Sequence, residues 1–476
     1  MAQAQAREGA RKLDRAGAKA TRTLRLWATP IVLTLAVLSA LAGLYLGGVL
    51  RPRVSLRGFP VAVVNEDVGP AGRNVLEALH SGLDKDKFDV RVLSHDEALR
   101  QLDTAQIYGA AAIPPDFSAK LQTFAATAMR PGHADRPVIT ISTNPRAGTL
   151  GASIAGQSLT QAIAAVQTRV GGQLSTRATH QTGGAPMASA ALLMLASPIN
   201  IQNTEHNPLP AGTGNGLSAF YYSLLLLLAG FTGSIMIGPL VDSMLGHAPA
   251  QFGPVYQFAQ PVNISRFRTL LIKWALMVVL AVLTSAVFMA IADVLGMPIV
   301  HGWGLWLYGV LAITAVAITS TSLITVLGWI GLVVSTLLFL RLPSAGPTVP
   351  LEASPSFFRW LDTFEPMHQI FLGVRTLLYF DGRADAGLSH AVTMTTIGLV
   401  IGVLLGGITT HLYGRRGYAP NPRAAGRPRT RKIRWRFASP ATAPVASAAT
   451  SPQLPPGATQ TERDVHRTAW PPARRQ

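Results

Sequence analysis

The chain has 476 residues, of which 49% are hydrophobic and only 13% are charged, a balance typical of a protein dominated by membrane segments. It contains no cysteine, which excludes disulfides, thiolate metal sites and cysteine nucleophiles. The net charge of +18 lies mostly in the two tails, since residues 1–25 hold seven Lys/Arg against two acids and residues 414–476 hold thirteen against two. Basic tails beside membrane segments favour anionic lipid, and not nucleic acid, as their partner.

The first apolar segment, residues 26–50, is uncharged and long enough to cross a bilayer. The sequence Ala40-Leu41-Ala42 within it resembles a signal-peptidase site, so the segment is either a retained anchor or a cleaved signal. The apolar run continues to Leu50, which favours the anchor.

Residues 51–216 follow without a further membrane segment and are numerous enough to form a domain with its own core. Apolar and alternating patterns predict strands around residues 59–64, 88–93, 109–113 and 137–142, with helices around residues 75–83, 95–102 and 148–170. This repeated order of strand and helix predicts an α/β domain with a mixed or parallel sheet. Residues 183–216 are rich in Pro and Gly, and we expect them to be irregular.

The second half carries the remaining membrane segments, predicted at residues 217–241, 270–295, 302–320, 323–341 and 391–412. The uncharged stretch across residues 302–340 is too long for one crossing, and we expect it to break at the Ser/Thr cluster of residues 319–322. An external connector is predicted for residues 342–390 and a disordered basic tail for residues 413–476.

The charge distribution predicts the topology. Both basic tails are expected in the cytoplasm, which requires an even number of crossings. The fold class is therefore predicted as a helical protein of the plasma (inner) membrane with six transmembrane helices and a large extracytoplasmic α/β domain, residues 51–216, between the first and second helices.

Three short motifs carry a resemblance to a known family. They are FPVAVVNEDVG at residues 59–69, which holds Asn65, Glu66 and Asp67; IPPDFS at residues 113–118, which holds Pro114, Asp116 and Phe117; and HNP at residues 206–208, which holds Asn207 and Pro208. These motifs, over a similarity that extends from residue 26 to residue 412, resemble the phage infection protein (YhgE/Pip) family, which is related to the ABC type 2 exporter permeases. The resemblance implies export of a hydrophobic or amphipathic envelope compound by a dimer that takes its energy from a separate ATP-binding subunit.

The catalytic and cofactor motifs that we considered do not occur. The chain has no Gly-x-x-x-x-Gly-Lys-Ser/Thr phosphate loop, no Gly-x-Ser-x-Gly elbow and no His pair at zinc spacing. The predicted spans also lack deeply placed acids and histidines, which disfavours a proton-driven pump. We therefore expect no enzyme activity, cofactor or metal; the alternative to a permease is a non-transporting receptor or scaffold in the envelope.

For several residues the sequence allows two interpretations. Asn65, Glu66 and Asp67 form either a polar turn or a cation site. Glycines at four-residue spacing pack helices together within one subunit or between subunits; they are Gly43 and Gly47 in the first span and Gly398, Gly402 and Gly406 in the last. Five arginines either touch lipid or dock an ATPase: Arg7, Arg11 and Arg15 in the tail, and Arg266 and Arg268 in the loop before the third span.

Overall fold

The structure is a computed structural model that describes residues 24–49, 52–128, 134–181, 189–252, 255–257, 259–260, 262, 264–339, 349–355, 357 and 365–416. Arg7, Arg11 and Arg15, most of the predicted C-terminal tail and part of the predicted connector lie outside these residues.

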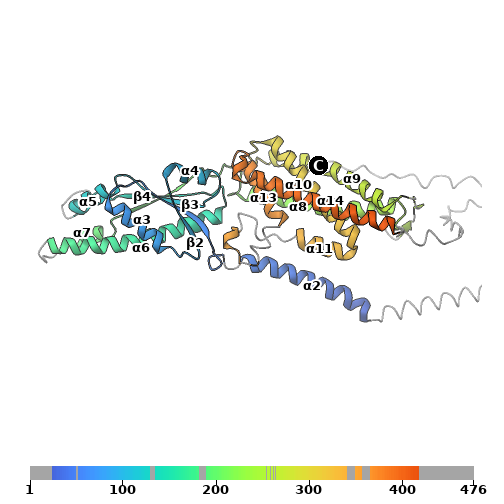
Figure 1. The fold of residues 1–476 in the computed structure, drawn as a ribbon, viewed down its shortest axis with the longest axis horizontal. Helices are drawn as coiled ribbons and strands as arrows, with labels where there is room; N and C mark the ends of the chain where they lie inside the picture. Colours follow the sequence, from blue (N-terminus) through green and yellow to red (C-terminus); the bar gives the residue numbers. More distant parts are fainter. Residues whose placement is uncertain are drawn as a thin grey trace, which may run out of the picture. The chain divides into compact units, whose positions relative to one another are not determined.

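A five-stranded mixed sheet forms the centre of the α/β domain, residues 52–216 (Figure 1). Its strands are β1 (Phe59–Asn65), β2 (Phe88–Leu93), β3 (Gly109–Ile113), β4 (Val138–Thr143) and β5 (Asn200–Glu205), in the order β2-β1-β3-β4-β5. β1 is parallel to both of its neighbours, β3 is antiparallel to β4, and β4 is parallel to β5. Of the two sheet types predicted, the structure therefore has the mixed one.

Helices cover both faces of this sheet, and the alternation of β1 decides which residues meet which helix. The helices are α3 (Pro70–Gly82), α4 (His95–Asp103), α5 (Phe117–Thr127), α6 (Thr149–Gln181) and α7 (Ser189–Ala196). Val61 and Val63 pack into the core beneath α3 and α6, whereas Ala62 and Val64 pack against α4 on the opposite face. Each face of β1 is thus buried, as its continuous apolar sequence predicts.

The prediction that residues 183–216 are irregular is wrong in part, because α7 and β5 lie within them. β5 reads NIQNTE, and only Ile201 and Thr204 are partly buried in it. A polar edge strand of this kind is held by its hydrogen bonds to β4, and local hydrophobic periodicity does not reveal it.

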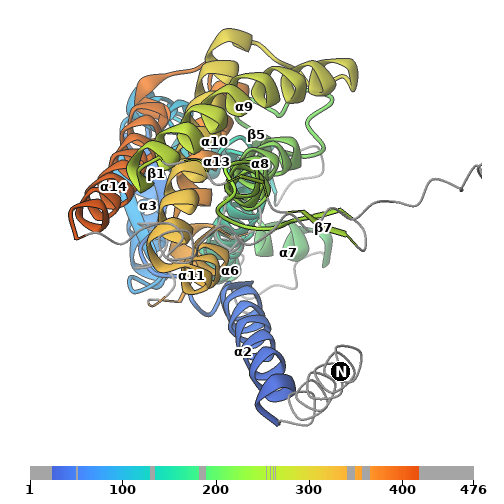
Figure 2. The same ribbon diagram turned by 90° about the vertical axis from the view of Figure 1, so that its right-hand side faces the viewer.

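Within the described residues, four helices are long and apolar enough to cross a membrane: α8 (Leu217–Met244), α9 (Arg266–Val294), α10 (Gly302–Leu327) and α14 (Leu388–Arg415). They make this a membrane protein. α10 lies at the centre of the group and contacts α8, α9 and α14, which surround it in Figure 2. In its most apolar window 56% of the residues are buried, against 22% in α9 and α14, whose outer faces are left for lipid.

Further elements complete the fold. α2 (Leu24–Val49) corresponds to the first predicted span, and α11 (Trp329–Phe339) follows α10 directly. A two-stranded hairpin, β6 (Ala250–Phe252) and β7 (Val255–Gln257), lies between α8 and α9. The described part of the predicted connector contains the short 3-10 helices η1 (Leu351–Ala353) and η2 (Ala384–Ala386), together with α13 (Pro366–Tyr379).

The predicted break at residues 319–322 is wrong. α10 continues through them and ends at Leu327, and the chain turns at Gly328, whose φ of +64° favours glycine. The hydroxyl groups serve packing instead, because the Ser320 Oγ lies 2.7 Å from the Ser234 Oγ of α8 and the Thr319 hydroxyl donates to the Gly398 carbonyl of α14 at 3.2 Å. Buried hydroxyls with partners on neighbouring helices do not interrupt a membrane helix.

Candidate functional site

Two of the sequence motifs meet at a buried carboxylate. Asp67 follows β1, and its Oδ2 accepts hydrogen bonds from the Ser118 hydroxyl at 2.5 Å and the Gly72 N–H at 3.0 Å. Asn65 closes the turn, since its Oδ1 accepts from the Asp67 N–H and its Nδ2 donates to the Asp67 carbonyl, both at 3.2 Å. The motif around Asp67 and the motif that ends in Ser118 therefore join the starts of α3 and α5.

The electrostatics of Asp67 fit a structural turn. Burial raises the pKa of this carboxyl group, but hydrogen bonds from Ser118, Gly69 and Gly72 lower it, and the net pKa lies below the usual value of 3.8. The described residues contain no group of three or more His, Cys, Asp or Glu side chains that could hold a metal ion. One of the two carboxylate oxygens of Asp67, Oδ2, is already used by Ser118 and Gly72.

The other motif residues around this turn have ordinary structural positions. Phe117 is fully buried at the start of α5, and its N–H donates to the Pro114 carbonyl at 3.1 Å. Asp116 is exposed and pairs with Lys120 at 2.7 Å. Glu66 is exposed as well, and its carboxylate lies 3.9 Å from the His95 Nδ1.

A second buried polar group lies where the α/β domain meets the membrane helices. Arg375 of α13 is only 8% exposed, and its Nη1 donates to the Ala147 carbonyl of the α/β domain at 2.8 Å. The guanidinium also lies 5.8 Å from the ring centre of Phe371 and 5.4 Å from that of Phe380, within cation–π range. A charged side chain of α13 is thus enclosed by aromatic rings and bonded to the other domain.

Tyr108 and Glu352 lie beside this arginine. The Tyr108 hydroxyl donates to the Glu352 Oε2 at 3.2 Å, and the Tyr108 ring stacks on Phe59 of β1 with ring centres 4.6 Å apart. Burial, reinforced by the Glu352 charge, raises the pKa of Tyr108 well above its usual value, so the hydroxyl stays protonated. Burial lowers the pKa of Arg375, whereas Tyr108 and Glu352 raise it, and a guanidinium remains charged throughout. We call Arg375, Tyr108 and Glu352 the junction cluster.

A further set of contacts ties the same two regions together. Arg146 donates from Nη1 to the Tyr379 carbonyl at 3.0 Å and from Nη2 to the Pro208 carbonyl at 3.2 Å. The Tyr379 hydroxyl lies 2.8 Å from the Ser218 Oγ and accepts from the Ala219 N–H at 3.2 Å. The lead-in to α8 is therefore bonded to both the α/β domain and α13.

The third sequence motif lies at this junction too. Asn207 donates from Nδ2 to the Asp103 Oδ1 at 2.8 Å, and the His206 Nε2 lies 2.9 Å from the same oxygen. This motif thus fastens the segment before α8 to the end of α4.

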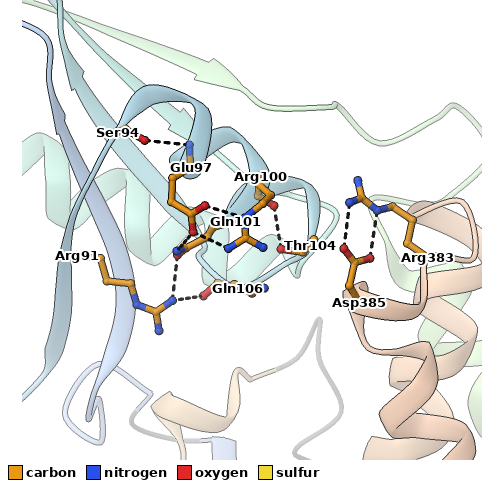
Figure 3. A network of polar contacts seen from close by, with 9 residues as sticks. All are labelled: Arg91, Ser94, Glu97, Arg100, Gln101, Thr104, Gln106, Arg383 and Asp385. Carbon is orange, nitrogen blue, oxygen red and sulfur yellow. Dashed lines mark hydrogen bonds and ion pairs between the residues drawn. The ribbon is translucent and has the colours of Figure 1, made fainter.

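Charged side chains of α4 face the loop before α14 (Figure 3). Glu97 accepts from Arg100 and Gln101, hydrogen bonds that lower its pKa to about 2. Arg383 and Asp385 pair at 3.1 Å on the other side. The hydrogen bond that Arg100 donates to Glu97 raises the pKa of Arg100, and the Asp385 charge adds to this effect.

The opposite end of α8 carries a different ion pair. Lys273 of α9 is buried, and its Nζ lies 2.8 Å from the Asp242 Oδ1. Both residues line a cavity of about 360 Å³ to which Arg266 also contributes. Arg268 is exposed in the first turn of α9, where its N–H donates to the Ser265 Oγ at 3.3 Å. Of the five arginines predicted either to touch lipid or to dock an ATPase, Arg266 and Arg268 are the two within the described residues.

The glycines of α14 differ in what they face. A Cβ atom on Gly402 would lie 2.8 Å from the Thr319 Cα, and one on Gly406 would lie 2.5 Å from the Ser322 Oγ, so both glycines approach α10 of the same chain closely. A Cβ atom on Gly398 would meet nothing within 4 Å. Gly43 is equally open, and Gly47 lies near the end of α2.

The junction cluster is not predicted by the sequence patterns, although one signal for it is present. Residues 366–380 are predicted as part of a connector, yet α13 is a helix in which almost every residue is buried. Arg375 interrupts the otherwise apolar run IFLGV-R-TLLYF. A lone arginine in an apolar helix indicates a partner from another element, but its identity depends on the tertiary fold.

These features define a helical membrane protein with a mixed α/β domain that precedes its four long apolar helices in the sequence and is joined to them by buried polar contacts. The chain belongs to the family described as "Protein of unknown function (DUF3533)", which matches residues 29–403, from α2 into α14. No curated protein and no solved structure matches the chain.

Proposed function

We propose that the protein is a transport subunit of the plasma membrane that exports a hydrophobic or amphipathic envelope compound with energy from a separate ATP-binding protein. In this proposal the chain crosses the membrane six times, with both termini in the cytoplasm and the α/β domain outside. Two copies, or one copy and a related chain, form the working unit. The four long apolar helices and the basic tails support this arrangement.

The observation that carries the proposal is the burial of Arg375 between α13 and the α/β domain. Enclosing a charged side chain is unfavourable unless its interactions compensate, and a domain that is merely tethered to a membrane does not need such a contact. α13 also packs against α8, α10 and α14. A shift among these helices is therefore transmitted to the α/β domain, as a cargo-handling machine requires.

The need for a partner follows from the sequence. The chain has no phosphate loop for ATP, and the acids of α8 and α9, Asp242 and Asp293, lie close to the helix ends, where they do not form a relay for protons. Energy for transport must then come from another polypeptide.

The test is a pull-down of the tagged chain from its native membrane in mild detergent, with the partners identified by mass spectrometry. We expect a stoichiometric ATPase whose turnover in nanodiscs changes when this chain is added. Recovery of the chain alone, or with envelope proteins only, contradicts the transport function and favours a receptor or scaffold.

Arg375→Met probes the junction within the same assay. We expect the variant to retain the ATPase but to lose most of the response of its turnover, because the contact between α13 and Ala147 is gone. The junction should weaken by about 1–3 kcal/mol, the cost of leaving a buried acceptor unpaired, which faster hydrogen exchange across α13 would report. Arg383→Met is the matched control, since Arg383 pairs with Asp385 at an exposed position. Equal responses from the two variants would argue against a role for Arg375 in coupling.

A further inference from the structure

The α/β domain has a groove on the side away from α4. It has a volume of about 810 Å³ and lies between α3, α5, α6 and α7, of which α5 and α7 lie at the left end of this domain in Figure 1. This volume is within the range of small-molecule sites, about 300–1,000 Å³. As far as the described residues go, the junction cluster and the membrane helices contribute none to its lining.

The floor of the groove is apolar. Val166, Val170 and Leu174 recur every four residues along α6 and form a stripe about 12 Å long at 1.5 Å per residue. Val75 of α3 and Leu121 of α5 face the same space and are almost fully buried. An elongated apolar floor of this shape fits a hydrocarbon chain better than a polar solute.

One wall carries positive charge. Arg169 and Arg177 line the groove from α6, both are exposed, and neither forms an ion pair within the described part of the chain. Among the described residues that line the groove, the only acid is Glu77 of α3. Two guanidinium groups beside an apolar floor match an anionic oxygen-bearing head group, which arginine binds through paired hydrogen bonds.

The far wall is formed by the motif turn described above. Pro70, Ala71 and Ser118 line the groove, and the Ala71 N–H donates to the Ser118 hydroxyl at 3.1 Å. The hydroxyl of this serine in turn donates a hydrogen bond to the Asp67 carboxylate. The turn thus fixes the distance between α3 and α5, which sets the width of the groove.

We infer that this groove binds a single-chain anionic amphiphile, with its acyl chain along the α6 stripe and its head group on Arg177, about one turn beyond Leu174, while Arg169 adds positive charge along the same wall. The inference deepens the proposed transport function, because it names the class of cargo that the α/β domain receives. Binding itself needs neither the ATPase nor transport.

The test uses the full chain in nanodiscs of zwitterionic lipid and a palmitic acid that carries a photoreactive diazirine in its chain. After irradiation, peptide mapping should find the label in α3, α5 and α6. Ala126→Trp and Gln173→Trp place an indole in the groove from two exposed positions. Each should reduce this labelling about tenfold, a loss of about 1.4 kcal/mol of binding, because the indole fills space that the acyl chain needs.

The head group is tested separately. The double variant Arg169→Gln with Arg177→Gln should reduce labelling by the acid about tenfold, yet leave labelling by the matched diazirine alcohol unchanged. Arg136→Gln, at an exposed position outside the groove, is the control and should behave like the unaltered chain. Equal loss for acid and alcohol would refute the anionic head group.

Two further results would overturn the inference. Label confined to the membrane helices would mean that the amphiphile does not enter the groove, and unchanged labelling in both tryptophan variants would place it elsewhere in the domain. Neither result bears on recovery of the ATPase, so failure of this inference and failure of the transport function are distinguishable.

Discussion

Asp67 is a buried carboxylate that remains ionised because its environment supplies donors. The hydroxyl of Ser118 and the N–H of Gly72 both point at its Oδ2, and hydrogen bonds to an ionised group are stronger than those between neutral groups. Neighbouring glycines make this approach possible, because a Cβ atom on Gly72 would lie 2.5 Å from the same oxygen. The residues of the motif are thus explained by the turn they build.

Asp67→Asn should destabilise the α/β domain by about 1.5–3 kcal/mol at pH 7, the usual worth of hydrogen bonds to a charged group. Because the folded pKa of Asp67 lies below its usual 3.8, the stabilisation is present above that value and is lost as the pH falls through the lowered pKa. The difference between variant and parent should therefore be largest at neutral pH and shrink below pH 3.8. Urea unfolding would be followed by tryptophan fluorescence in a Phe88→Trp background, since residues 52–216 contain no tryptophan of their own.

The control for this prediction comes from the second motif. Asp116→Asn removes an exposed pair with Lys120 and should cost no more than about 0.5 kcal/mol. If the two Asn variants were equally stable, the buried hydrogen bonds of Asp67 would contribute nothing.

At the level of single residues, the sequence predicted the turn at Asn65 and Asp67 but not its partner. Turn-forming residues after an apolar strand are a local signal. Ser118 is 51 positions away, and its approach depends on how α5 packs beside α3, which no local pattern contains. The contact between Arg375 and Ala147 could not be predicted either, because it too depends on how distant elements pack.

Secondary-structure elements were predictable where their own side chains face a core. β1, β2 and β3 lie at their predicted positions because each has an apolar or alternating run bounded by turn residues. α5, α7 and β5 were not predicted, since they are short or polar and are stabilised by neighbours. The predicted end of α10 lies too early in the sequence, because the Ser and Thr residues do not interrupt the helix. The helix ends before Gly328.

The contact between α10 and α14 gives a prediction at this scale. Gly402→Ala should lower the thermal stability of the purified protein, because the new Cβ atom would meet the Thr319 backbone and force the two helices apart. Overpacking of this kind costs about 1–3 kcal/mol. Thermal unfolding in detergent, read as the loss of the monodisperse peak in size-exclusion chromatography, measures it.

Gly398→Ala is the matched control on the same helix. Its Cβ atom would meet nothing within 4 Å, and alanine favours helix over glycine by about 1 kcal/mol, so stability should be unchanged or higher. Equal stability of the two variants would show that α10 and α14 are not in close contact at Gly402.

At the scale of the whole molecule, the junction determines how the two domains act. Hydropathy predicted the four long helices and charge predicted a topology, but neither predicts that α13 inserts between the helices and the α/β domain. The junction combines a buried charge with a carbonyl-bonded Arg146, and the exposed pairs of Figure 3 lie beside it. Apolar packing accompanies these contacts, since Ala147 belongs to the same buried cluster as Phe371 and Tyr379.

The predicted topology is directly testable because the natural chain has no cysteine. Single cysteines at exposed positions, Thr123→Cys in the α/β domain and Asp381→Cys before α14, should react with a membrane-impermeant maleimide in intact cells. Tyr256→Cys in β7 and Arg416→Cys after α14 should react only in inverted vesicles. The unaltered chain supplies the unlabelled control. An even number of crossings requires the two ends of the chain to lie on the same side of the membrane. Labelling of Arg416→Cys from outside would mean an odd number of crossings between the basic N-terminal tail and that position. It would therefore refute the six-span arrangement.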